Sequence, residues 1–278
     1  MIQREVPTTV AACCSTIYGS PLAELLVGDS FHPGGREGTR ELLAAGELRP
    51  GMHLLDAGCG LGASARLAAD EFGVFVDAVD ASGSIVERAR GRGDNTRIQW
   101  REAALPALPY ADASFDAVLA ECVLSTTDRR AALAEIHRVL RPGGRLLLSD
   151  VVSHGATLPS TIHPLVGAAL CVSDAWRGGE MDELISDTGF RIARSWHRSS
   201  AIITLIDRVV ARAKVIGLAA QDLGLDVGSL IAPLDPTIDT SPAGQADLRA
   251  AADALIEEVQ GGRLRYLALV AIRDEAAA

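Results

Sequence analysis

Lysine is nearly absent from this chain of 278 residues, in which Lys214 is the single lysine among 26 basic residues. A mechanism that needs a Schiff-base lysine or a phosphate-loop lysine therefore has one candidate. Acidic residues outnumber basic residues by 36 to 26, which gives a net charge of −10 at pH 7. An acidic protein repels phosphate backbones and anionic lipid surfaces. These shortages argue against pyridoxal chemistry, ATPase chemistry and a nucleic acid partner.

Long apolar runs are missing as well. No run approaches the ~20 residues that a membrane helix requires, and the first residues lack the apolar core of a secretory signal. The chain has five cysteines, an odd number that argues against a structural disulfide framework. We therefore expect a cytoplasmic protein with reduced thiols and with no membrane as its partner.

From about residue 50, short apolar runs alternate with amphipathic helical patterns, which predicts a doubly wound, mostly parallel α/β sheet. The expected strands are His53–Asp56, Val74–Asp80, Thr96–Arg101, Phe115–Glu121, Arg145–Val152, Phe190–His197 and Arg263–Arg273. The expected helices are Ala63–Phe72, Ser84–Arg92, Asp128–Leu140, Glu180–Thr188, Ala201–Leu218 and one that ends at Gln260. The last strand is expected to return to the sheet as an edge.

The most specific segment is His53–Gly62, in which a strand breaks into a glycine turn that opens a helix. Glycines in such a turn let the backbone approach a bound ligand closely. Asp56 ends the strand just before the turn, where an acid suits an ammonium group and does not suit a pyrophosphate. Asp80 ends the next strand, where a carboxylate can accept hydrogen bonds from ribose hydroxyls. The alternative is that Asp80 only caps the Ser-Gly-Ser turn that follows it.

With these residues in place, four motifs between about Arg49 and Val152 resemble the class I S-adenosylmethionine-dependent methyltransferases. They are Asp56-Ala-Gly-Cys-Gly-Leu-Gly62, Asp80 ending the second strand, Glu102-Ala103 with Leu105-Pro106-Ala-Leu-Pro109 and Ser114-Phe-Asp-Ala117, and Leu140-Arg-Pro-Gly-Gly144 before the fifth strand. The resemblance implies a seven-stranded Rossmann-like sheet of order 3-2-1-4-5-7-6. It also implies S-adenosyl-L-methionine as cofactor and S-adenosyl-L-homocysteine as product.

By the same resemblance, the glycine turn and Asp56 hold the methionine part, Asp80 holds the ribose, and Glu102 and Ala103 flank the adenine. The full expected cofactor set is Asp56, Gly58, Cys59, Gly60, Gly62, Asp80, Ala81, Glu102, Ala103 and Glu121. The family more often has Asp at the place of Glu102. A nicotinamide-dependent oxidoreductase and a non-catalytic nucleoside-binding domain share some of these features and remain alternatives.

The acceptor is expected beyond the carboxyl ends of the strands, where strand Phe115–Glu121 delivers Glu121 and Cys122. A free cysteine such as Cys122 is most often a small buried apolar residue. However, a cysteine pair near the N-terminus, Cys122, and Cys171 in the insertion after the fifth strand together resemble arsenite methyltransferases. Thiolates are soft ligands that hold a soft centre. The first hypothesis is therefore a small acceptor with a soft centre such as trivalent arsenic, bound by Cys122 and Cys171 together with Cys13 or Cys14 of the N-terminal pair.

The runner-up hypothesis is carbon or nitrogen methylation of an aromatic indole, phenol or quinone. The segment from Tyr18 to Gly35 resembles a lid that folds over the substrate, and it carries His32. An imidazole suits proton transfer near neutrality, so His32 and Glu121 are candidate bases, and Tyr18 is a further catalytic candidate. A turn-stabilising role beside Pro33 is the plainer alternative for His32.

The expected organisation is an N-terminal helical lid at 1–48 and a methyltransferase domain at 49–278, with a cap insertion at about 153–180. No metal is required by this scheme. The apolar stripe on the helix from Ile202 to Ile216 fits either the core or a homodimer contact.

Overall fold

The computed structural model describes residues 21–159, 170–223 and 241–275, together with the single positions 162, 167, 226, 228 and 239. The expectations for Tyr18 and for the N-terminal cysteine pair fall outside these residues. Within the described part of the chain, no helix has both the length and the apolar character needed to cross a membrane.

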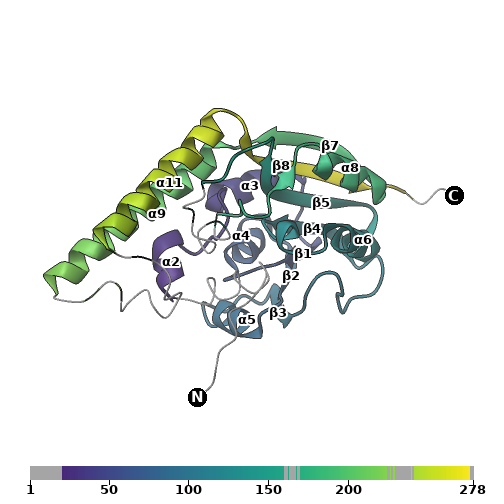
Figure 1. The fold of residues 1–278 in the computed structure, drawn as a ribbon. Coiled ribbons are helices and arrows are strands. Elements are labelled where there is room, and N and C mark those ends of the chain that lie inside the picture. Colours follow the sequence, from purple (N-terminus) through teal and green to yellow (C-terminus); the bar gives the residue numbers. More distant parts are fainter. Residues whose placement is uncertain are drawn as a thin grey trace, which may run out of the picture.

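A sheet of eight strands forms the centre of the molecule (Figure 1). Its main path has the order β3-β2-β1-β4-β5-β8-β7, and β6 pairs with β5 beside that path. The strands are β1 (His53–Ala57), β2 (Phe75–Asp80), β3 (Ile98–Glu102), β4 (Phe115–Glu121), β5 (Leu140–Ser153), β6 (Trp176–Arg177), β7 (Phe190–His197) and β8 (Leu264–Arg273). The predicted α/β class and strand order are confirmed.

The last strand does not lie at the edge, and that expectation was wrong. β8 runs antiparallel to β5 on one side and to β7 on the other, so β7 is the edge strand. β8 is mostly buried along its length, as a central strand must be. Its near-continuous apolar sequence, Leu264–Arg273, was the sign of this interior position.

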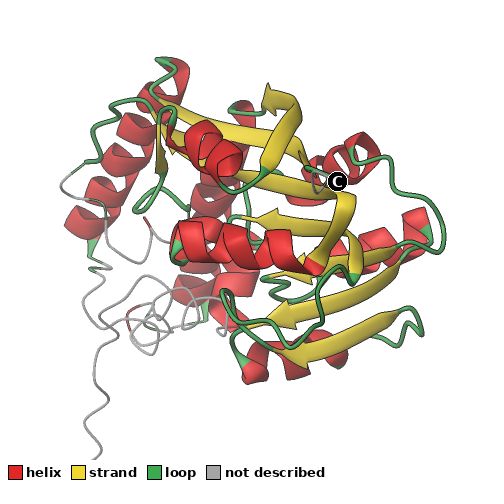
Figure 2. Cartoon of the chain, turned by 90° about the vertical axis from the view of Figure 1, so that its right-hand side faces the viewer, coloured by secondary structure: helices red, strands yellow, loops and turns green. Residues whose placement is uncertain are grey.

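Helices cover both faces of the sheet (Figures 1 and 2). They are α2 (Pro21–Val27), α3 (Gly35–Ala45), α4 (Ala63–Phe72), α5 (Gly83–Arg90), the short 3-10 helix η1 (Leu124–Thr126), α6 (Arg129–Val139), α8 (Glu180–Asp187), α9 (Ser200–Asp222) and α11 (Pro242–Gln260). α6 and α8 pack in one apolar core, and α3 and α4 pack in a second. The sheet therefore has one apolar layer on each face.

A third apolar cluster lies under the long helices α9 and α11, which run side by side (Figure 1). It includes Val27 from α2, Cys122, Cys171 and Tyr266. This cluster joins the N-terminal segment, the insertion after β5 and the last strand. It therefore assembles three distant parts of the chain beside the carboxyl end of β4.

Candidate active site

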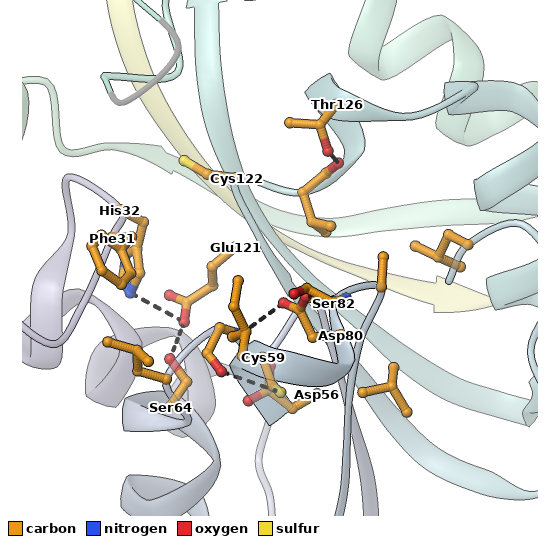
Figure 3. A pocket seen from close by; sticks show the side chains of 18 of the residues that line it. Phe31, His32, Asp56, Cys59, Ser64, Asp80, Ser82, Glu121, Cys122 and Thr126 are labelled. Atoms are coloured by element: carbon orange, nitrogen blue, oxygen red, sulfur yellow. Dashed lines mark hydrogen bonds and ion pairs between the residues drawn. The ribbon is translucent and has the colours of Figure 1, made fainter. Parts of the chain in front are cut away.

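A cavity of about 560 Å³ lies at the carboxyl ends of β1, β2 and β4, where the strand order reverses (Figure 3). Open parallel sheets bind their ligands at such switch points. Three acids at strand ends, Asp56, Asp80 and Glu121, line its floor. Residues 29–32, which precede α3, line it from the opposite side. The cavity therefore lies between the sheet and the N-terminal segment.

Asp56 is a buried acid without a positive partner. It is 3% exposed, and its Oδ2 has no hydrogen-bond partner among the described residues. Burial raises the pKa of Asp56 to about 8, and the nearby carboxylates of Glu121 and Asp80 add to the rise. A buried acceptor of this kind is costly unless a ligand donates to it. The site is therefore prepared for a donor group, and an ammonium would remove both the unpaired oxygen and the charge repulsion.

The glycine turn after β1 brings bare backbone to the cavity. Gly58 has φ +78°, and a Cβ there would lie 2.5 Å from Val123 Cγ2. Gly60 has φ +51°, and a Cβ there would meet no atom closer than Phe31 at 4.0 Å. Gly58 is therefore required by packing, whereas Gly60 keeps an open face toward the cavity.

Asp80 holds this turn in place. Its Oδ2 accepts a hydrogen bond from the Gly60 amide at 3.1 Å, and its Oδ1 accepts one from the Ser82 amide at 2.9 Å. Asp80 therefore does cap the turn that follows it, which was the alternative role expected for this residue. A carboxylate has further lone pairs, so Asp80 still has capacity for ligand hydroxyls. Burial raises the pKa of Asp80, while the two amides oppose the rise.

Glu121 is surrounded by hydroxyl donors and by His32 (Figure 3). Ser64, in the first turn of α4, donates to Oε2 at 2.7 Å, and Thr39 of α3 donates to the carboxylate at 3.0 Å. His32 Nε2 lies 3.4 Å from Oε2. The same nitrogen is 2.8 Å from the Ser30 hydroxyl. Glu121 is therefore fixed in orientation by groups from two helices and from the segment before α3.

The two described cysteines of the soft-centre hypothesis lie in the same buried apolar cluster. Cys122 follows β4, and Cys171 belongs to the insertion after β5. Both are buried, at 7% and 6% exposed, and both have a left-handed backbone with φ +54° and +57°. Burial raises the pKa of Cys122, and Cys171 adds to the rise. Non-glycine residues in this conformation are uncommon and concentrate at functional sites.

Most of the predicted residues line the cavity together. These are His32, Asp56, Gly58, Cys59, Gly60, Asp80, Ala81, Ala103, Glu121 and Cys122. Three others do not line it. Gly62 packs against the ring of Trp100, the exposed Glu102 carboxylate lies beside Gly83, and Cys171 reaches the cavity only through Cys122.

Sequence reasoning missed four polar residues of the site, namely Ser30, Thr39, Ser64 and Tyr266. Ser64 could have been found, because it stands in the first helical turn after the glycine loop, where side chains face a bound ligand. Thr39 and Tyr266 carry no local signal. They belong to elements whose contact with β4 exists only in the folded chain.

Comparison with known proteins agrees with this geometry. Residues 55–148 match the family described as Methyltransferase domain. An O-methyltransferase of Pyrenophora dematioidea is 36% identical over 163 residues, which are 55% of this chain and 60% of the relative. An arsenite methyltransferase of Halobacterium salinarum is 31% identical over 153 residues, which are 51% of this chain and 38% of the relative. The chain thus spans about three fifths or less of these relatives.

Solved structures match along nearly the whole chain. The [4+2]-cyclase SpnF has a TM-score of 0.68 at 22% identity, with 98% of both chains covered. At this identity the similarity concerns the fold. The domain match at residues 55–148, the motifs from Asp56 to Gly144 and the strand order are similar to those of class I S-adenosylmethionine-dependent methyltransferases.

Proposed function

We propose that this protein transfers a methyl group from S-adenosylmethionine to a small molecule bound in the same cavity. The observation that carries the proposal is the buried Asp56 carboxylate, whose unpaired Oδ2 lies in the wall of the cavity. It fits the ammonium group of the cofactor's methionine part. The glycine turn at Gly58 and Gly60 and the acceptor Asp80 are the other two elements that such a ligand needs.

The residues present fit the cofactor in charge as well as in shape. Asp56 would hold the ammonium group, Asp80 the ribose hydroxyls, and the apolar side chains of Val79, Ile85 and Leu105 would cover the adenine. When bound, S-adenosylmethionine supplies an electrophilic methyl group on a positively charged sulfur. The acids at the strand ends favour that positive charge.

The contribution of the chain is mainly one of position. Holding an acceptor and a methyl donor in reacting geometry removes up to about 7 to 11 kcal/mol from a barrier. Residues 29–34 would close the cavity as a lid, which is a shorter segment than the lid expected at 1–48. The segment before residue 29 is held over the same side of the sheet, because Glu24 of α2 pairs with Arg88 of α5 at 2.9 Å and with Arg92 at 2.5 Å. In contrast, α3 packs in the core, since Leu42 and Leu43 are fully buried.

For the acceptor we propose a soft, thiophilic centre such as trivalent arsenic. The observation that favours it is that Cys122, which lines the cavity, lies in one buried cluster with Cys171. Two thiols and a dihydroxyarsine can condense to form two As–S bonds and release two waters. The arsenic keeps its lone pair in this product, so it remains a nucleophile for methyl transfer.

A hydroxyl or aromatic acceptor is the second candidate, and the geometry of Glu121 with His32 favours it. The similarity to an O-methyltransferase supports it as well. In this case one of the two groups would accept the proton that the acceptor loses. Both ring nitrogens of His32 and both carboxylate oxygens of Glu121 have protein partners, so either group could take the role of the base.

Binding and transfer are tested separately. Calorimetry with S-adenosylhomocysteine should give a dissociation constant for the wild type, and Asp56→Asn should weaken it at least tenfold. Mass spectrometry of acceptor mixtures should then show methylated product together with released S-adenosylhomocysteine. Binding without any consumption of S-adenosylmethionine by any acceptor would overturn methyl transfer and leave a binding role.

A further inference from the structure

A chain of hydrogen bonds runs from the middle of the sheet to the cavity through Tyr266 of β8. The Tyr266 hydroxyl donates to Ser149 Oγ of β5 at 2.8 Å and lies 3.3 Å from His32 Nδ1. The other ring nitrogen of His32 faces Glu121. All these side chains are buried, with Tyr266 at 1% and Ser149 at 2% exposed. The chain is therefore shielded from water along its length.

The N-terminal segment lies directly on the tyrosine ring. A Cβ placed on Gly34 would lie 3.2 Å from Tyr266 Cε1 and 3.3 Å from its hydroxyl oxygen. Both distances are tighter than ordinary carbon contacts, so a side chain at Gly34 would push the segment away from the ring. The close approach places His32 within reach of Tyr266. The hydrogen bond between Tyr266 and His32 therefore forms only when this segment is docked on the tyrosine ring.

The direction of the protons follows from the partners. Because the Tyr266 hydroxyl gives its hydrogen to Ser149, its oxygen offers a lone pair to Nδ1, and Nδ1 carries the hydrogen. Tyr266 stays protonated and remains a donor, since burial raises its pKa well above the usual value. In the neutral ring Nε2 is then the acceptor, which can take a hydrogen bond from Ser30, and it donates to Glu121 only when the ring carries both hydrogens.

We propose that Tyr266 is a positioning residue that sets the tautomer and orientation of His32, and through His32 aligns Glu121 at the carboxyl end of β4. Tyr266 itself need not touch any ligand. Only the effect on ligand affinity rests on the proposed function. The tautomer of His32 can be measured on the ligand-free protein and stands without it.

The test compares three variants by nitrogen-15 NMR of the histidine ring nitrogens. Tyr266→Phe keeps the ring but removes the hydroxyl, so Nδ1 loses its acceptor and His32 should become a mixture of tautomers. Ser149→Ala frees the tyrosine hydrogen, which can then be donated to Nδ1, so His32 should shift to the Nε2–H form. Tyr110→Phe is the matched control, because the Tyr110 hydroxyl donates to Asp77 and not to His32. It should leave the His32 signals unchanged.

A second readout is the affinity for S-adenosylhomocysteine. Tyr266→Phe should weaken it about tenfold, the effect of losing one oriented hydrogen bond, while Tyr110→Phe should not change it. If the wild type has no affinity for this ligand, the proposed function fails and the NMR comparison still decides the role of Tyr266. Unchanged His32 signals in both Tyr266→Phe and Ser149→Ala would overturn the proposal, provided that thermal unfolding shows both variants folded.

Discussion

Glu121 Oε2 and His32 Nε2 lie 3.4 Å apart, with both side chains at most 8% exposed. The two residues come from β4 and from the segment before α3, so the contact exists only when that segment lies over the cavity. A shielded pair of this kind acts as a unit, because each group fixes the orientation of the other.

The first prediction is that the effects of substituting His32 and Glu121 on kcat are not additive. Glu121→Gln and His32→Gln should each lower kcat by about a hundredfold if the pair serves the transfer step, and each should weaken S-adenosylhomocysteine binding at least as much as Tyr266→Phe does. The double variant should cost little more than either single one, because the partner is already lost. Steady-state kinetics on the identified acceptor measures this. If the two losses of kcat multiply in the double variant, the contact between His32 and Glu121 does not contribute to kcat.

The second prediction concerns the stability of the ligand-free protein. The pKa of Asp56 is raised from 3.8 to about 8. Between about pH 4 and pH 8, the folded state therefore keeps a proton that the unfolded state releases, and the free energy of unfolding falls as pH rises through this window. Asp56→Asn removes the charge and should stabilise the protein by about 1 to 3 kcal/mol at pH 8, with a smaller gain at pH 5.

Urea unfolding at both pH values measures the effect of Asp56→Asn. Asp182→Asn is the control, because Asp182 is exposed on α8 and should change the free energy of unfolding little. The same Asp56→Asn variant should lose affinity for S-adenosylhomocysteine. A variant that is less stable than the wild type at pH 8 would contradict the strain assigned to this carboxylate.

The third prediction is for Asp80. Its carboxylate both supports the Gly60 turn and is the expected partner of the ribose. Asp80→Asn keeps one acceptor oxygen for the turn but removes the charge, so affinity for S-adenosylhomocysteine should fall by about 1.5 to 3 kcal/mol. Adenine alone has no ribose, so its affinity should fall less in Asp80→Asn. Calorimetry with both ligands separates the two roles, and equal losses would mean that Asp80 acts only through the turn.

The sequence was most informative where the site is built from residues that are close together along the chain. The glycine turn and the acids ending β1 and β2 were predicted because strand, turn and helix follow one another within a few residues. Glu102 was placed by resemblance, and in the folded chain its carboxylate lies beside Gly83 and outside the cavity wall. Gly62 serves the close packing of Trp100. Resemblance gave these positions, but side-chain packing decided which of them face the cavity.

Long-range contacts were beyond sequence reasoning. Tyr266 reaches His32 only because β8 is inserted between β5 and β7. The apolar pattern of β8 predicted a strand and the resemblance gave its place in the sheet, but nothing in the sequence paired Tyr266 with His32. Trp176 is another such case, because it is fully buried and donates to Asp150 at 3.1 Å, so it anchors the insertion after β5.

The fourth prediction concerns the charge of the acceptor. Five acids line the cavity, namely Asp29, Asp56, Asp80, Glu121 and Asp128, and no arginine or lysine of the described chain lines it. A phosphate group would meet only negative charge and would lose its hydration without compensation. Neutral or cationic acceptors should therefore be preferred at least a hundredfold over their phosphate esters. Competition between matched pairs of compounds measures this, and preferential use of the phosphate esters would contradict it.

The fifth prediction tests the thiol pair. If Cys122 and Cys171 bind a trivalent arsenical through two As–S bonds, then Cys122→Ser or Cys171→Ser leaves one soft ligand, and binding of phenylarsine oxide should weaken by more than about a hundredfold. Affinity for S-adenosylhomocysteine should persist in both variants. Cys59→Ser is the control, because Cys59 lies in the glycine turn, where its thiol donates to the Gly60 carbonyl. Protection from thiol alkylation, followed by mass spectrometry of Cys122 and Cys171, measures the binding. Equal affinity of the wild type and both serine variants would remove the soft-centre acceptor, and the hydroxyl or aromatic acceptor at Glu121 would then be the better assignment.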